Sequence, residues 1–173
     1  EILNKLKITK KKYFLVTLHR PESVDIKKNL SSLLKTFRAL QKKYDYPIIF
    51  PIHPRTKDKI KKLKLSFDRS IKIIEPLNYL EFLRLMKDSK LILSDSGGLQ
   101  EEASILGVPC ITLRTTTERQ ITVIRNVNII AGYNQDKILS AVKKFHNKKI
   151  KKIKDFGNGD VTNKIYKIMK SLK

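Results

Sequence analysis

The sequence predicts an α/β fold, in which a doubly wound, mainly parallel sheet of six strands carries helices on both faces. Two observations lead to this prediction. Short apolar runs alternate along the whole chain with longer segments of helical periodicity. Polar clusters follow five of the six expected strands, where a parallel sheet presents its carboxyl edge. With 173 residues, 40% of them hydrophobic, residues 1–173 are expected to form a single domain.

The expected strands are short runs of apolar and β-branched residues bounded by turn-forming residues, at 13–18, 47–52, 71–74, 91–94, 108–113 and 127–131. The expected helices have apolar positions three and four residues apart, and they cover roughly residues 26–43, 56–63, 79–87, 97–106, 135–148 and 161–172. Asn78 is the expected cap of the third helix, with Glu81 at the capping-box position. Gly107, followed by Pro109, ends the fourth helix.

The net charge of +22 raises the question of nucleic-acid binding. The lysines argue against it, because they cluster at 5–12, 57–64 and 143–154, in expected surface segments with few aromatic residues. Proteins that read nucleic acids use arginine heavily, whereas this chain has 30 lysines and eight arginines. A solvated, lysine-rich surface such as thermophilic proteins often have explains the charge better.

Composition and motifs exclude several other classes. No apolar run is long enough to span a membrane, and there is no metal-ligand spacing, Walker loop or Gly-x-Gly-x-x-Gly motif. The single cysteine, Cys110, lies in an expected buried strand, so no disulfide framework can form. We expect a cytoplasmic protein without metal or cofactor. The sequence shows no signal peptide. Because it begins with Glu1 instead of Met, we also expect it to be part of a longer polypeptide.

The loops that follow the expected strands contain the candidate binding residues. In a parallel sheet these loops share one edge, so their polar groups converge on one crevice. Residues 91–136 lack lysine but keep the residue types that bind phosphate and sugar hydroxyls, which indicates a nucleotide-sugar site. The candidates are His19, Arg20, Glu22, His53, Arg55, Leu77, Ser96, Gly97, Gly98, Glu102, Arg114, Glu118 and Arg119.

The segment Ser94-Asp95-Ser96-Gly97-Gly98 stands at a strand-to-helix turn. Free backbone amides at the positive end of a helix dipole suit a phosphate, although an ordinary capped helix has the same pattern. Arg20, Arg114 and Arg119 can supply positive charge to a diphosphate; the alternative is surface ion pairing. His19 and His53 each follow a buried strand, where a site role and a structural role are both open. Of Glu101 and Glu102, one is explained by the helix dipole, and the second can accept hydrogen bonds from ribose hydroxyls.

Together these segments resemble the C-terminal domain of the UDP-N-acetylglucosamine 2-epimerase family. The resemblance includes Gly107-Val108-Pro109, and the stretch at 157–160 is similar to the turn before the family's last helix. It implies the Rossmann-like C-terminal half of a glycosyltransferase-B-like fold, with the N-terminal catalytic domain absent and a homodimer in the full-length protein. It also implies that UDP is eliminated from UDP-GlcNAc and added back to give UDP-ManNAc, with His19 near the departing diphosphate and Glu102 at the ribose. Residues 96–98 would hold the phosphates.

Two segments depart from the family pattern. Glu22-Ser23 stands where the family has Glu-Asn, and Gln120-Ile121 where it has Pro-Glu, which removes a carboxylate near the cleft. Three rivals remain: a hydrolysing epimerase that releases ManNAc, another glycosyltransferase-B nucleotide-sugar enzyme and, ranked last, a basic nucleic-acid module. Release of free ManNAc would reveal the hydrolysing epimerase, and transfer of sugar to an acceptor would reveal the other glycosyltransferase-B enzyme. Salt-sensitive binding of oligonucleotides would reveal the nucleic-acid module.

Overall fold

The computed structural model describes residues 1–68, 70–148, 150–157 and 159–172. The strands are β1 (Phe14–Thr17), β2 (Ile48–Pro51), β3 (Ile71–Ile74), β4 (Leu91–Ser94), β5 (Cys110–Thr112) and β6 (Asn128–Ile130). The helices are α1 (Ile2–Lys5), α2 (Pro21–Val24), α3 (Lys27–Tyr44), α4 (Pro54–Lys62), α5 (Tyr79–Asp88), α6 (Gly97–Leu106), α7 (Gln120–Ile124), α8 (Gln135–His146) and α9 (Val161–Ser171).

All six strands are parallel and lie in the order β3-β2-β1-β4-β5-β6, so the predicted fold class is confirmed. The order reverses direction between β1 and β4, where the chain returns from the edge strand β3 to the centre of the sheet. Loops that leave neighbouring strands at such a switch point diverge to opposite faces and open a crevice at the carboxyl edge. The residues after β1 and β4 therefore border the natural ligand position.

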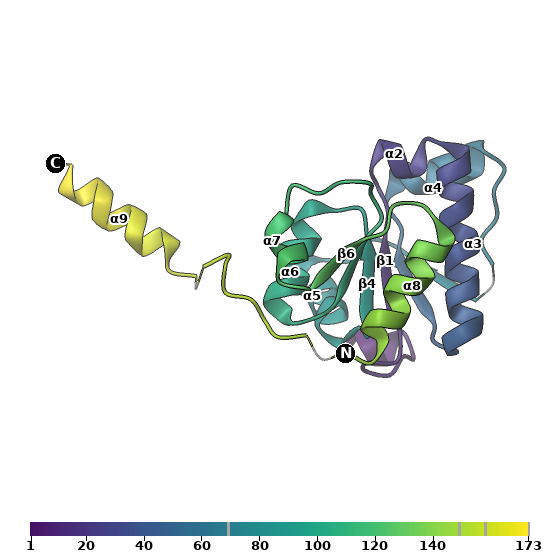
Figure 1. The fold of residues 1–173 in the computed structure, drawn as a ribbon, viewed down its shortest axis with the longest axis horizontal. Coiled ribbons are helices and arrows are strands. Elements are labelled where there is room, and N and C mark those ends of the chain that lie inside the picture. The colour runs from purple at the N-terminus through teal and green to yellow at the C-terminus, as the bar shows by residue number, and fades with distance from the viewer. Residues whose placement is uncertain (69, 149, 158, 173) are drawn as a thin grey trace.

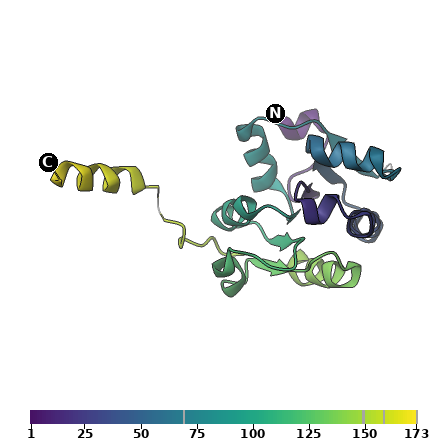
Figure 2. The ribbon, with the colours of Figure 1, turned by 90° about the horizontal axis from the view of Figure 1, so that it is seen from above.

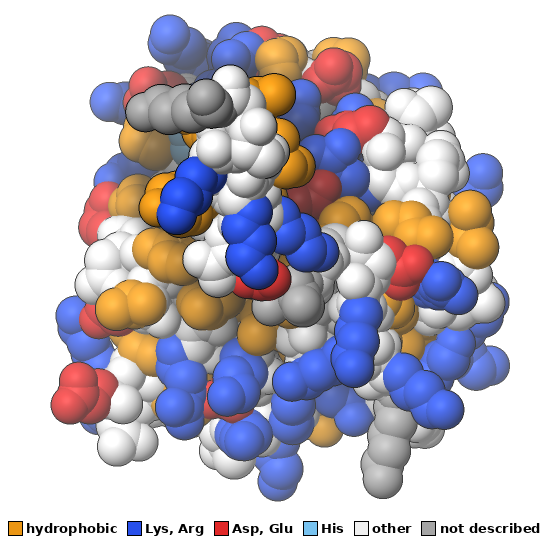
Figure 3. Space-filling model, turned by 90° about the vertical axis from the view of Figure 1, so that its left-hand side faces the viewer, with side chains coloured by type: hydrophobic (Ala, Val, Ile, Leu, Met, Phe, Trp, Pro, Cys, Tyr) orange, Lys and Arg blue, Asp and Glu red, His pale blue; other side chains and the backbone are white. Residues whose placement is uncertain are grey.

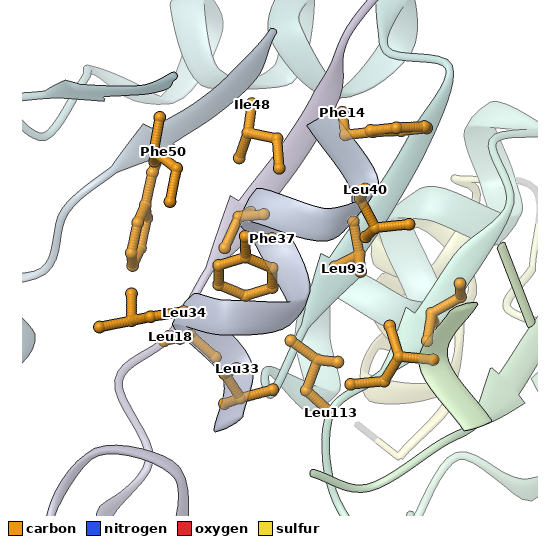
Figure 4. Close-up of a cluster of buried hydrophobic side chains, with 14 of the residues drawn as sticks. Phe14, Leu18, Leu33, Leu34, Phe37, Leu40, Ile48, Phe50, Leu93 and Leu113 are labelled. Atoms are coloured by element: carbon orange, nitrogen blue, oxygen red, sulfur yellow. The ribbon is translucent and has the colours of Figure 1, made fainter. Parts of the chain in front are cut away.

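Helices cover both faces of the sheet, as Figures 1 and 2 show. In one core cluster, the buried apolar side chains of α3 and α8 pack against one face of the sheet. Phe37 of α3 and Phe50 of β2 meet in this cluster, with ring centroids 6.4 Å apart (Figure 4). The second cluster packs α1, α5 and α6 on the other face, around Leu15 and Ile92. Cys110 lies in this second cluster, and burial raises the pKa of its thiol to about 12.

Three short helices were not predicted. One turn gives no measurable periodicity, so α1 and α2 could not be read from the pattern, and the β-branched residues of α7 resemble a strand. The prediction that Asn78 caps α5 is confirmed, since its side chain accepts a hydrogen bond from the amide of Glu81 at 2.9 Å. The carboxylate of Glu81 accepts its hydrogen bond from Asn78 Nδ2, also at 2.9 Å. Gly107 ends α6 in the left-handed conformation, with φ of 71°.

The final helix, α9, stands apart from the α/β body (Figure 1) and buries none of its described residues. Its apolar side chains form a stripe at helical spacing, and they are exposed: Val161, Ile165, Ile168, Met169 and Leu172. The turn before it has Gly157 and Gly159 at positive φ, whereas Asn158 of the same predicted turn lies outside the described residues.

On the face that Figure 3 shows, lysine and arginine side chains lie among other residue types. Within the described residues, no helix is long and apolar enough to cross a membrane.

Candidate functional site

Asp95 and His19 meet at the switch point, one from the end of β4 and the other from the end of β1. The Asp95 side chain is completely buried, and its carboxylate accepts hydrogen bonds from the amides of His19 (3.0 Å) and Arg20 (2.9 Å). His19 Nδ1 lies 3.1 Å from Asp95 Oδ1. Because a carboxylate only accepts, the proton of this contact belongs to Nδ1. Asp95 thus fixes the His19 ring and leaves Nε2 free of this contact.

The Asp95 carboxyl is held in its ionised form. Burial by itself would raise its pKa, but the hydrogen bonds from the His19 ring and from the amides of Arg20 and His19 outweigh burial and lower it. A depressed folded pKa contributes stability above the unfolded value, near 3.8, and this contribution is lost as pH falls through the folded pKa.

We therefore expect Asp95→Asn to unfold more easily at neutral pH, by about 2–3 kcal/mol, because an amide group would face donors that it cannot all accept. Urea unfolding at pH 7 measures the loss. Repeated below pH 4, it should show a smaller gap between variant and wild type, and an unchanged gap would contradict the assigned role of Asp95.

The amino end of α6 is open. Ser96 is the N-cap residue, but its side chain makes no capping hydrogen bond, which an ordinary capped helix would show. In the part of the chain that the structure describes, no hydrogen bond is made to the amides of Gly97 or Gly98. Gly98 is exposed, and a Cβ added there would meet nothing within 4 Å. The helix dipole and these amides form a cradle for an anion.

Gly97 is constrained by the protein itself. A Cβ added there would collide with the carboxylate of Glu118, which approaches from the β5–α7 loop. Arg114 Nη1 binds the other oxygen of Glu118 at 2.9 Å, and Arg20 Nη2 lies 3.9 Å from the first. A hydrogen bond from its own backbone amide and the Arg114 side chain together lower the pKa of Glu118, against an opposing effect of burial.

The remaining candidate arginines are also ion-paired. Arg119 pairs with Glu101, and Arg55 pairs with Asp25 at the end of α2. For Arg114 and Arg119 the structure therefore shows the ion pairing that the sequence left open as the alternative. Arg114 and Arg119 nevertheless stand beside the cradle, whereas the Arg55 pair ties α4 to α2.

The two candidate carboxylates of α6 differ. Both lie in the second turn of the helix rather than the first. Glu101 is paired with Arg119, whereas the side chain of Glu102 has no hydrogen bond or ion pair with any residue that the structure describes. Burial, followed by repulsion from Glu101, raises the pKa of Glu102. The geometry thus leaves Glu102 as the free acceptor of the pair.

A pocket of about 220 Å³ opens beside the cradle, between the ends of β1, β2 and β3. Its mostly apolar wall brings together predicted residues from four loops, and the rings of His19 and His53 lie 5.8 Å apart, centroid to centroid. His53 Nδ1 accepts a hydrogen bond from the amide of Arg55 at 3.2 Å, which caps α4. The lining includes His19, His53, Leu77, Phe82, Ser96 and Leu99. Glu22 is exposed on α2 and does not line it.

Sequence reasoning missed the role of Asp95 and a buried polar cluster around Gln100, Thr117 and Asn128. An asparagine within the apolar run 127–131 was the one available signal for this cluster. His146, the third histidine of the chain, lies in α8, and its ring stacks on Tyr44 with centroids 4.4 Å apart. Among the described residues, no group of three or more His, Cys, Asp or Glu is arranged to hold a metal.

Comparison with known proteins agrees with this geometry. The sequence profile described as UDP-N-acetylglucosamine 2-epimerase matches residues 1–170. The chain belongs to this family. The epimerase of Methanocaldococcus jannaschii is 50% identical over 161 residues, which is 91% of this chain and 44% of that protein. That of Methanococcus maripaludis is 54% identical over 143 residues, or 80% of this chain and 39% of that protein.

Solved structures of epimerases from the family show the same arrangement. The crystal structure of the Methanocaldococcus jannaschii UDP-GlcNAc 2-epimerase in complex with UDP-GlcNAc and UDP matches 98% of this chain and 48% of that chain, with a TM-score of 0.89 and 46% identity. This chain therefore spans about half the length of the epimerases that it resembles. Its sheet is the Rossmann-like half of their glycosyltransferase-B-like fold.

Proposed function

We propose that this chain is the UDP-binding half of a UDP-GlcNAc 2-epimerase, which interconverts UDP-GlcNAc and UDP-ManNAc by elimination and re-addition of UDP. The open amino end of α6 is the observation that carries the proposal. Unpaired amides and the unobstructed surface at Gly98 match what a diphosphate needs. Family membership and the ligands of the structurally similar epimerase support the choice of UDP.

Each part of UDP has a counterpart in the crevice. The diphosphate would lie over Gly97 and Gly98, where Arg20, Arg114 and Arg119 can exchange carboxylate partners for phosphate oxygens. The base would fill the apolar pocket against Leu77, and Ser96 lines the same pocket. His19, oriented by Asp95, would present Nε2 to the departing diphosphate. The roles of Glu22, His53 and Arg55 in substrate binding remain predictions.

The whole-protein part of the proposal concerns what this chain lacks. We propose that residues 1–173 are a single UDP-binding domain and that the rest of the polypeptide supplies the opposing wall of the cleft and the catalytic carboxylates. A homodimer and a cytoplasmic location belong to the same proposal. An assay of the full-length protein separates this proposal from the hydrolysing alternative: UDP-ManNAc is the product expected here, and free ManNAc is the product of a hydrolysing epimerase.

UDP binding by the chain tests the core of the proposal. NMR titration suits the weak affinity expected when one wall of the cleft is present. The amide signals of Gly97 and Gly98 should shift on addition of UDP and remain in place on addition of uridine. UDP that leaves these amides unchanged would show that the diphosphate does not bind at α6.

A second prediction concerns the ribose. If Glu102 accepts both ribose hydroxyls, Glu102→Gln should lower the preference for UDP over 2′-deoxy-UDP by roughly threefold, because a neutral amide is a weaker acceptor. Glu101→Gln is the matched control, since Glu101 is engaged by Arg119. Isothermal or NMR titration gives the ratios, and an equal change in both variants would show that the two carboxylates are wrongly assigned.

A further inference from the structure

Gln100 lies entirely within the protein, yet both ends of its side-chain amide are used. Its Oε1 accepts hydrogen bonds from Thr117 Oγ1 at 2.6 Å and from Asn128 Nδ2 at 3.0 Å. Its Nε2 donates to the backbone carbonyl of Ser96 at 3.2 Å. One side chain thus joins the amino end of α6, the β5–α7 loop and the start of β6.

The contact with Ser96 acts on the anion cradle. The Ser96 carbonyl and the Gly97 N–H belong to the same planar, trans peptide unit and point in opposite directions. Holding this carbonyl with Gln100 Nε2 therefore sets the direction of the Gly97 N–H. The unused side chain of Ser96 makes no capping bond that could do this instead.

The other end of Gln100 acts on the arginine loop. Thr117 Oγ1 gives its proton to Gln100 and accepts a hydrogen bond from the amide of Arg119 at 3.0 Å. Glu118, between these two residues, holds Arg114 and lies against Gly97. The position of the loop relative to α6 therefore depends on the Gln100–Thr117 bond.

The hydrogen bonds around Asn128 fix the orientation of the Gln100 side-chain amide. Asn128 Oδ1 accepts from Thr112, and its Nδ2 also donates to Thr122, whose own proton goes to the Arg119 carbonyl. Thr117 and Asn128 both donate to Gln100 Oε1, so rotation of the Gln100 amide by half a turn would place its NH2 group against these two donors.

We propose that Gln100 is a positioning residue that aligns the Gly97 amide with the arginine loop, so that both bind the diphosphate of the nucleotide at once. This inference rests on the proposed function, because it needs a diphosphate over α6. It assigns no chemistry to Gln100 itself, which is buried and cannot touch the ligand. A residue that only stabilised the fold would influence all parts of the nucleotide equally.

The test compares UDP with uridine, which lacks the phosphates, by NMR titration of the 173-residue chain and its variants. Thr117→Val keeps the shape of the side chain but removes the hydroxyl that Gln100 holds. We expect UDP affinity to fall about tenfold, equivalent to about 1.4 kcal/mol, with less than about a twofold change for uridine. Gln100→Met should give the same selective loss, and Thr117→Ser, which keeps the hydroxyl, should restore wild-type binding of UDP.

Thr36→Val is the control for burying valine in place of threonine, because Thr36 is buried in α3 and bonds within its own helix. It should lower stability without a change in the ratio of UDP to uridine affinity. If wild type binds UDP and Thr117→Val keeps the wild-type ratio, the positioning role is wrong. If wild type does not bind UDP, the proposed function itself fails, and the inference fails with it.

Discussion

Gly98→Val is expected to lower the affinity of the chain for UDP by about a hundredfold, or about 2.8 kcal/mol, and to leave the fold intact. The loss has a local cause. Valine would cover the exposed surface at Gly98, over which the diphosphate is proposed to lie, and each hydrogen bond to a charged group contributes about 1.5–3 kcal/mol. The protein accommodates the new side chain, because nothing lies within 4 Å of the added Cβ.

Gly98→Ala and Gly97→Ala provide matched comparisons. The smaller methyl group at Gly98 should cause a smaller loss of UDP affinity. At Gly97 it would displace the Glu118 carboxylate and disturb its pair with Arg114. Calorimetry or NMR titration gives the affinities, and thermal unfolding shows whether each variant folds. Wild-type affinity in folded Gly98→Val would exclude the amino end of α6 as the diphosphate site.

The second large effect is an absence of reaction: the chain should not exchange the C2 proton of UDP-GlcNAc in deuterated water. Removal of this weakly acidic proton needs a base of raised pKa in a closed site. Asp95 and Glu118 both have lowered pKa values, and Asp95 is also fully engaged in hydrogen bonds. Neither carboxylate is suited to the task.

Glu102 decides how the result is interpreted, since its pKa is raised and no described residue pairs with it. Incubation of the chain with UDP-GlcNAc, followed by NMR of the sugar, measures deuterium at C2. Deuterium that disappears in Glu102→Gln would identify Glu102 as the base and overturn its assignment to the ribose. Deuterium that persists in that variant would still place the base within these residues. Either outcome would contradict the proposal that the rest of the polypeptide supplies the chemistry.

The sequence by itself determined the parallel sheet, the order of its strands and longer helices along the chain, and the edge of the sheet at which the polar loops gather. These features follow from local rules that act over a few residues. Apolar periodicity separates strands from helices, and Asn78 and Gly107 mark helix ends because of hydrogen-bonding and backbone properties of their own. Connection by helices then makes the strands parallel, which brings their carboxyl ends together.

Only the tertiary structure decided what each side chain at that edge contacts. Arg55 turns to Asp25, Glu118 lies against Gly97, and Asp95 orients His19 across the switch point. Gln100 joins segments that are 17 and 28 residues away along the chain. Such contacts depend on how separate loops meet in space, and hydrogen bonds over these separations leave no periodic signal in the sequence.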